Sequence, residues 1–287
     1  MSPGELAIAG VALVAATVTG ALGYGFSSIT VPAALLVYSG RVLNPALVLV
    51  EAFINAVALW TNRRSLHAVW PRMRPLLAGV VPGAVAGSLL LAYTDAGRLK
   101  VLTFAVLLPL ILLQSAGVRR PIRRERAVAV PAGVALGALY GATTISGPPL
   151  ALLFNNQGLT KNEFRAALSI FRLAESLCTL VAYLALGLFT RSALAVAATL
   201  APSAAIGIPL GYFALRSITP ESFRRACMAT DALLVAFALA RTLVDLHLLS
   251  AGAAYAGFAA VACAEASIVA AFALGRLRRP AVEEAAR

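Results

Sequence analysis

The sequence predicts an all-α polytopic membrane protein: two inverted repeats, each a broken or re-entrant helix plus three transmembrane helices, and one extra C-terminal transmembrane helix. Of its 287 residues, 60% are hydrophobic and 13% are charged, and the mean hydropathy is +0.86. Soluble domains carry about 45–50% apolar and about 25% charged residues. Apolar runs of about 20 residues, long enough to cross a bilayer, recur along the chain. These features exclude a water-soluble globule and a disordered chain.

Seven apolar runs are long enough to cross the membrane as unbroken helices. Basic residues gather in the joints between runs, where they orient helices and contact anionic lipid head groups. The net charge of +12 therefore indicates membrane lipids, and not nucleic acid, as the partner. The seven runs cover residues 43–62, 74–93, 98–117, 164–187, 192–215, 220–243 and 250–275.

Two further apolar stretches are interrupted. Residues 5–38 contain a break at 23–28, and residues 127–154 contain one at 141–149, both rich in glycine, hydroxyl or proline residues. Such residues interrupt a helix. In a membrane the freed backbone must face protein or a water-filled cavity. We therefore expect both breaks to lie inside the protein.

The distribution of basic residues predicts the course of the second broken stretch. If it crossed the membrane once, the two faces would hold 11 and 12 basic residues. If it enters and returns to the same side, one face holds 18 and the other holds 5. Because basic residues concentrate on the cytoplasmic side, the second course is favoured. It places the joints at 62–74, 117–127 and 155–164 and the C-terminal tail in the cytoplasm.

This course gives the two halves the same order of elements and opposite orientations. Residues 32–36 are echoed at 149–153, an offset of 117, and the Gly-x-x-x-Gly segment at 83–87 is echoed at 207–211, an offset of 124. Inverted repeats with broken helices are typical of secondary transporters, which bind substrate where the breaks meet. The expected units are a first repeat at 5–117, a second at 127–245 and an additional transmembrane helix at 250–276.

The first broken stretch has a pattern of small and hydroxyl residues followed by a proline, formed by Gly20, Gly23, Gly25, Ser27, Ser28, Val31 and Pro32. Together with its partner at 141–149 and the paired Gly-x-x-x-Gly segments, this pattern resembles the sulfite exporter TauE/SafE family of bacterial inner-membrane transporters. The similarity covers residues 5–245. Tyr24 and Phe26 occupy positions where the family often has glycine, and the helix at 250–275 is an addition.

The resemblance implies a multi-pass secondary transporter of the bacterial inner membrane. Its substrate would be a small sulfur-containing anion such as sulfite or an organosulfonate, for example sulfoacetate. Transport would be coupled to an ion or a proton by alternating access. A permease for another small organic anion, such as a carboxylate, and an anion channel are the alternatives. We expect no enzymatic activity, no catalytic residue, no cofactor and no metal, and a homodimer is possible.

The two breaks supply the candidate substrate site. A helix N-terminus presents free N–H groups and a partial positive charge, and nearby hydroxyls add donors for an anion. A short helix is expected at 29–38 after the first break; the alternative is a simple kink packed against a neighbouring helix. The candidate substrate-binding residues are Gly23, Tyr24, Gly25, Phe26, Ser27, Ser28, Thr143, Thr144, Ser146, Gly147, Pro148 and Arg172.

Charged residues inside the apolar runs complete the site. Arg172 lies about eight residues inside its run, and its guanidinium matches the paired oxygens of a sulfonate. Alternatively, Glu175 at i+3 neutralises it. Glu51, which shares a helix face with Asn55, is the first candidate for proton coupling; the alternative is a pair with a loop arginine. The coupling candidates are Glu51, Asn55, Glu175 and Asp231, while Glu265 is expected to contact another helix or subunit and Asn155 and Asn156 to end the second broken element.

Overall fold

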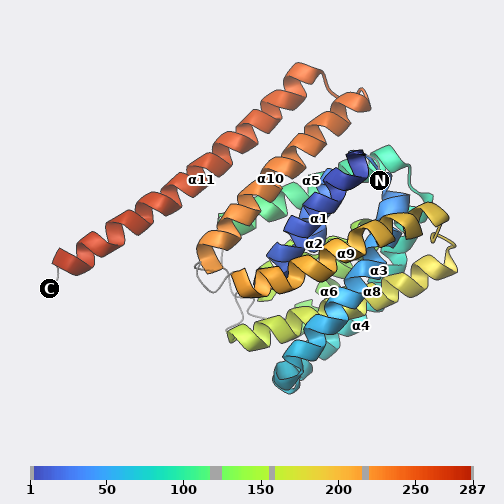
Figure 1. Ribbon diagram of the computed structural model, residues 1–287, viewed down its shortest axis with the longest axis horizontal. Helices are drawn as coiled ribbons and strands as arrows, with labels where there is room; N and C mark the ends of the chain where they lie inside the picture. Colours follow the sequence, from blue (N-terminus) through green and yellow to red (C-terminus); the bar gives the residue numbers. More distant parts are fainter. Residues whose placement is uncertain (1–2, 117–124, 155–158, 215–219, 286–287) are drawn as a thin grey trace.

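A computed structural model describes residues 3–116, 125–154, 159–214 and 220–285, and these form helices joined by short connections (Figure 1). The first part of the chain forms α1 (Pro3–Leu22), α2 (Phe26–Ala34), α3 (Gly40–Asn62), the 3-10 turn η1 (Arg63–Ser65), α4 (Leu66–Tyr93) and α5 (Ala96–Ser115). The second part forms α6 (Glu125–Thr143), α7 (Gly147–Phe154), α8 (Lys161–Ala185), α9 (Arg191–Ala214), α10 (Pro220–Asp245) and α11 (Ala251–Ala285).

All seven predicted crossing runs form helices, but α4 begins at Leu66 and not at 74, and α11 ends at Ala285 and not at 275. By length and apolar composition, five segments of the described chain are able to cross a membrane, with α3 and α4 counted as one. The run at 220–243 forms α10 but is not one of the five. The protein is therefore a multi-pass, all-helical membrane protein. The five segments are Gly40–Tyr93, Ala96–Leu113, Asn162–Ala185, Arg191–Phe213 and Ala251–Ala271.

Both predicted breaks are present, and both are shorter than expected. The first covers residues 23–25, where Gly23 and Gly25 have φ angles of 88° and 120°, which favour glycine. The helix expected at 29–38 is wrong in its bounds: α2 runs from Phe26 to Ala34, so three predicted break residues, Phe26, Ser27 and Ser28, lie in its first turn. The second break covers residues 144–146.

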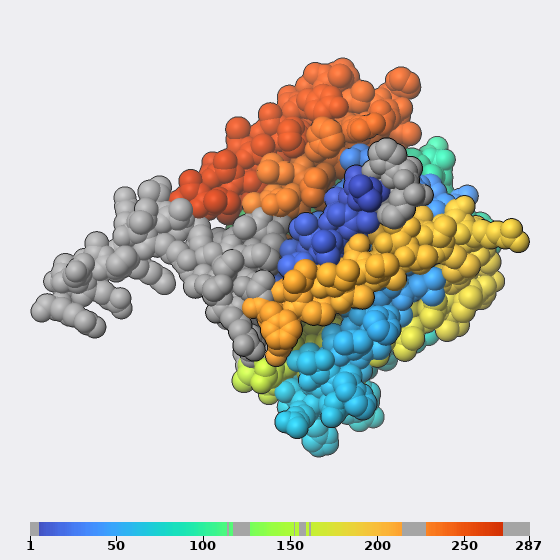
Figure 2. Space-filling view, in the orientation of Figure 1, coloured from blue at the N-terminus to red at the C-terminus, as the bar shows by residue number. Residues whose placement is uncertain are grey.

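Two pairs of helices pack with their backbones in contact, and each pair joins one helix from each half of the chain. Gly83 and Gly87 of α4 face the backbone of α6, where a Cβ would overlap main-chain atoms. Gly207 and Gly211 of α9 face α1 in the same way. Small residues allow this close approach in membrane proteins. Figure 2 shows α1, in blue, directly beside the amber α9.

One end of the bundle collects the start of α3 and the ends of α6 and α8. Asn44 Nδ2, near the start of α3, donates to the carbonyl of Ala142 in α6 at 2.8 Å. Tyr183 OH, near the end of α8, donates to the neighbouring Gly141 carbonyl at 2.6 Å. We refer to this end as the Asn44 end. Helix α4 runs back to the Asn44 end, and only two residues separate it from α5. Helix α5 therefore also begins at the Asn44 end.

The chain reverses direction at both breaks. Arg165, near the start of α8 and so at the opposite end, donates to the Ala21 carbonyl at the end of α1. Lys100, near the start of α5, donates to the Leu35 carbonyl that follows α2. Hence α1 runs away from the Asn44 end and α2 returns toward it. Likewise α6 reaches the Asn44 end, whereas α8, which follows α7, begins at the opposite one.

Helices α10 and α11 lie side by side at one edge of the bundle (Figure 1). Most of the described side chains of α11 are exposed. An exception is Glu265, whose Oε2 accepts a 2.7 Å hydrogen bond from Ser115 Oγ of α5. Glu265 therefore contacts another helix, which is one of the two outcomes predicted for it.

Candidate functional site

Residues around the two breaks lie against each other. Gly147 begins α7, and a Cβ at this position would lie 3.4 Å from Cδ2 of Tyr24 and 3.7 Å from Oγ of Ser28. Helices α2 and α7 also contact each other. The residues around the two breaks therefore face one junction, although more than 100 positions separate them in the sequence.

The first break contributes buried hydroxyl groups to this junction. Ser27 and Ser28 are 1% exposed, and Tyr24 and Phe26 are also buried. No side chain caps the N-terminus of α2, because its N-cap residue is Gly25. In the described part of the chain, Ser28 Oγ has no hydrogen-bond partner. The first turn of α2 thus keeps an unused donor beside Gly147.

The hydroxyl groups of the second break are used in two different ways. Thr143 Oγ1 donates to the Leu139 carbonyl, and Thr144 Oγ1 donates to the Thr143 carbonyl, so both stabilise the local backbone. Thr144 has a φ of 59°, in the left-handed region. Ser146 instead donates to Oε2 of Glu175 in α8, at 2.5 Å. Of the three, only Ser146 reaches the charged residues of the core.

Arg172 forms an ion pair with Glu51, which brings the two halves of the chain together. Arg172 Nη2 lies 2.6 Å from Oε1 of Glu51, and the two side chains are 2% and 1% exposed. Arg172 therefore does not form its ion pair with Glu175, the helical neighbour considered as an alternative. Similarly, the arginine that binds Glu51 lies within α8 and not in a loop.

Further polar side chains surround this ion pair. Tyr140 OH donates to Oε2 of Glu51 at 2.7 Å and shares a 2.9 Å hydrogen bond with Ser176 Oγ. Asn55 Nδ2 donates to the same Ser176 Oγ at 3.0 Å. The sequence reasoning missed Tyr140 and Ser176. The only signals for them were that Ser176 lies one helical turn after Arg172 and that Tyr140 lies just before the second break. We refer to Glu51, Asn55, Tyr140, Ser146, Arg172, Glu175 and Ser176 as the polar core.

Some atoms of α8 in and beside the polar core have no partner. Glu175 Oε1, Arg172 Nε and Thr179 Oγ1 are buried without a hydrogen bond to any described residue. Buried polar atoms in proteins are almost always hydrogen-bonded to protein or water. The unused atoms therefore mark where a bound molecule or water would find partners.

Two predicted groups do not join the polar core. Asp231 is fully buried in α10, and neither of its carboxylate oxygens has a hydrogen-bond partner in the described structure. Helix α10 packs mainly against α5 and α11. Asn155 and Asn156, the expected end of the second broken element, lie outside the described residues.

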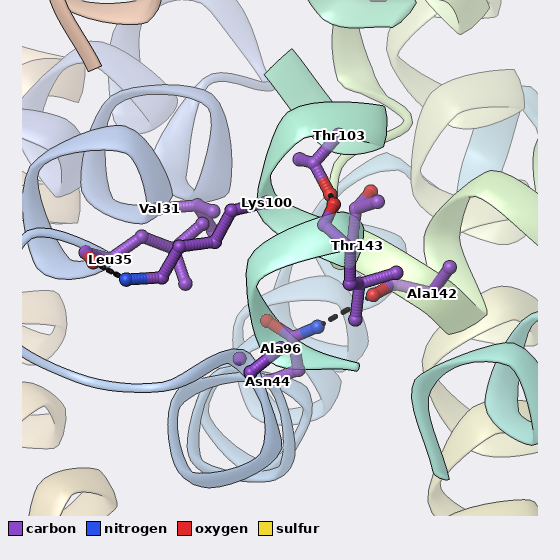
Figure 3. Close-up of a pocket in the computed structure, with 10 residues that line it drawn as sticks. Val31, Leu35, Asn44, Ala96, Lys100, Thr103, Ala142 and Thr143 are labelled. Carbon is purple, nitrogen blue, oxygen red and sulfur yellow. Dashed lines mark hydrogen bonds between the residues drawn. The ribbon is translucent and has the colours of Figure 1, made fainter. Parts of the chain in front are cut away.

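A narrow pocket at the Asn44 end leads toward the second break (Figure 3). Val31 and Leu35, Asn44, Lys100 and Thr143 are among its lining residues. Lys100 Nζ bonds to the Leu35 carbonyl at 2.6 Å across the pocket. Its free space is of the order of one water molecule. Lys100 falls at the start of the predicted run at 98–117, and the sequence reasoning did not connect it with the breaks.

The arrangement has groups suited to an anion and lacks those of a metal centre. Among the described residues, no three His, Cys, Asp or Glu side chains are grouped so as to hold a metal ion. Donors are present instead: the N-terminal turn of α2, Ser28, Ser146 and Arg172. Several donors together can replace the water molecules that an anion loses on binding.

Comparison with known proteins identifies the family. Residues 8–240 match the family model of the sulfite exporter TauE/SafE, which covers most of the chain. No curated protein and no solved structure matches the sequence. With its apolar helices, its two breaks and this match, the chain belongs to the sulfite exporter TauE/SafE family of membrane transporters.

Proposed function

We propose that this protein is a secondary transporter that moves small sulfur-containing anions, sulfite or small organosulfonates, across the bacterial inner membrane. Transport proceeds by alternating access and is coupled to an ion or proton gradient. The observation that carries the proposal is the meeting of the two breaks, where buried donors from both halves face one junction.

The anion binds at this junction. The free N–H groups and partial positive charge of α2 attract it, and Ser28 and Ser146 donate hydrogen bonds from opposite sides. Arg172 supplies a fixed positive charge nearby, and its unpartnered Nε is available as a further donor. The glycines at 25 and 147 keep the approach to the backbone open.

Two inverted repeats form this site. The pairing of α1 with α9 and of α4 with α6 supports this. In each pair, the helix before the break of one repeat packs along the second unbroken helix of the other repeat. In both pairs the helices run parallel. Opposed half-helices of this kind bind substrate and coupling ion near the middle of the membrane in other secondary transporters.

The face that holds most of the basic residues lies in the cytoplasm. Cysteine substitutions at positions 120 and 160 test this, because both joints should be labelled from the same side in oriented membrane vesicles. Labelling from opposite sides would contradict the proposed topology.

Flux measurements in proteoliposomes test the function itself. We expect saturable uptake of sulfite or a small sulfonate that responds to an imposed pH or ion gradient. A preference for carboxylates would indicate the permease of another anion, and flux that neither saturates nor responds to a gradient would indicate a channel.

Arg172→Lys tests the role of the guanidinium in binding. This change keeps the charge and removes the planar pair of donors, so the apparent affinity for the anion should fall. The matched control is Arg98→Lys, which changes an exposed arginine of α5. Unchanged affinity in Arg172→Lys would show that Arg172 only balances Glu51.

A further inference from the structure

We propose that Ser146 and Glu175 form the proton-binding site of this transporter, which takes up one proton with each anion and moves both in the same direction. The proposal rests on the proposed function, because it requires that an anion binds beside Ser146. It selects one coupling residue from four candidates and fixes the direction of coupling.

The first argument is the number of protons on the Ser146 hydroxyl. A serine hydroxyl has one proton to donate, and here it is donated to Glu175 Oε2. While Glu175 is ionised, Ser146 presents only lone pairs to an anion. When Glu175 carries a proton, the carboxylic acid can donate to Ser146 Oγ, and the serine proton becomes free for the anion. Binding of the anion and protonation of Glu175 therefore favour each other.

The second argument is the balance of charge around Glu175. Its nearest charged neighbours are Arg172, which is paired with Glu51, and Glu51 itself. An anion added beside an ionised Glu175 would leave two negative charges close to one arginine that is already paired. Uncompensated charges inside a membrane protein are costly. A proton on Glu175 removes one of them.

Among the side chains that the structure describes, no other ionisable group that packs against α8 takes over this role. From α3 the facing group is Glu51, from α6 it is Tyr140, and on α8 itself they are Arg172 and Cys178. Helix α7 carries no ionisable side chain. The ionisable side chains of η1 and α4 lie toward their ends: Arg63, Arg64, His67, Arg72, Arg74 and Tyr93.

Proton uptake can be counted by calorimetry on the purified protein. Methanesulfonate is the probe, because it stays ionised throughout and any proton taken up belongs to the protein. Titration in buffers of different ionisation enthalpy gives the number of protons bound with each anion. We expect about one, and an affinity that falls by up to about tenfold for each pH unit over which free Glu175 is ionised. The same count is made with sulfite after subtraction of sulfite's own ionisation.

Glu175→Gln is the decisive variant, because its amide can donate to Ser146 Oγ as the protonated acid does. It should bind the anion with no proton uptake and with an affinity independent of pH. Proton-driven accumulation should be lost, while exchange of anion for anion continues. The matched control is Glu265→Gln, because Glu265 is also buried and also accepts a hydrogen bond from a serine, Ser115, but lies on α11. This control should still take up one proton.

Ser146→Ala gives a second test in case Glu175→Gln does not fold. Glu175 then keeps only its charge interaction with the anion, so fewer protons should be taken up with each anion than in the wild type. Proton uptake that persists in Glu175→Gln, uptake in Ser146→Ala equal to that of the wild type, or wild-type binding without proton uptake overturns this inference and leaves the proposed function standing. Wild-type protein that binds neither methanesulfonate nor sulfite overturns both.

Discussion

Helices α3 and α8 carry an acidic residue at the same place and surround it in different ways. The offset of 124 residues that relates Gly83 to Gly207 also relates Glu51 to Glu175. Glu51 accepts hydrogen bonds from Arg172 and Tyr140, whereas Glu175 accepts one from Ser146.

One difference between the halves accounts for the ion pair on Glu51. At the same offset, the counterpart of Arg172 is Val48, which is fully buried among apolar side chains. The only arginine of the pair therefore balances one of the two acids and not the other. Glu51 is thereby held in an ion pair, whereas Glu175 is the acid for which we propose proton exchange.

The largest expected effect comes from removing the arginine. Arg172→Leu should destabilise the protein by about 3–5 kcal/mol, because it leaves Glu51 as an unpaired buried charge. Combining it with Glu51→Leu should recover most of the loss. Thermal unfolding of the detergent-solubilised protein measures both, with Arg98→Leu as the exposed control. A double variant no more stable than the single one would show that the pair itself holds α3 and α8 together.

The glycine contacts test whether the two halves pack equivalently. Gly87→Ala and Gly211→Ala should each cost about 1–3 kcal/mol, because the added Cβ would overlap the carbonyls of Ala138 and Thr17 respectively. Gly257→Ala on α11 meets no atom within 4 Å and should have little effect. The comparison is again made by thermal unfolding. A loss confined to one of the two helix pairs would break the equivalence of the halves.

The two breaks should differ in their tolerance of a side chain. Gly25→Ala should cost about 1–2 kcal/mol of stability, because its φ of 120° disfavours any residue with a Cβ. Gly147→Ala should cost less, since its Cβ would meet Tyr24 and Ser28 at ordinary van der Waals distances. Both should weaken anion binding, which calorimetry can measure separately from stability. Equal losses of stability would contradict this difference between the breaks.

The smallest expected effects concern the two serines. Ser28→Ala and Ser146→Ala should each weaken anion binding by about 1 kcal/mol, the usual net contribution of one hydrogen bond. Only the second should also change proton uptake. If Ser28→Ala abolishes binding while Ser146→Ala leaves it unchanged, the site belongs to the first half alone.

Much of the fold could be predicted from the sequence, because membrane-spanning helices and their breaks are local properties. Apolar runs marked the helices, and glycine with hydroxyl residues marked both breaks. The start of α2 was misplaced by three residues, since serines next to glycine indicate both a break and a first helical turn.

The charged contacts were harder to predict. Arg172 had a carboxylate one turn away, yet its partner is Glu51, 121 positions earlier, because only tertiary packing decides which helices meet.

The glycine contacts described for α4 and α6, and for α1 and α9, also limit how the molecule can move. Helices whose backbones touch cannot slide past each other without steric overlap, so we expect the two helices of each pair to move together. Each pair contains one helix from each half of the chain. If the first half of the chain tilted as one body against the second, the helices of both pairs would have to slide past each other. We therefore expect any motion of the proposed transport cycle to move each mixed pair as a unit.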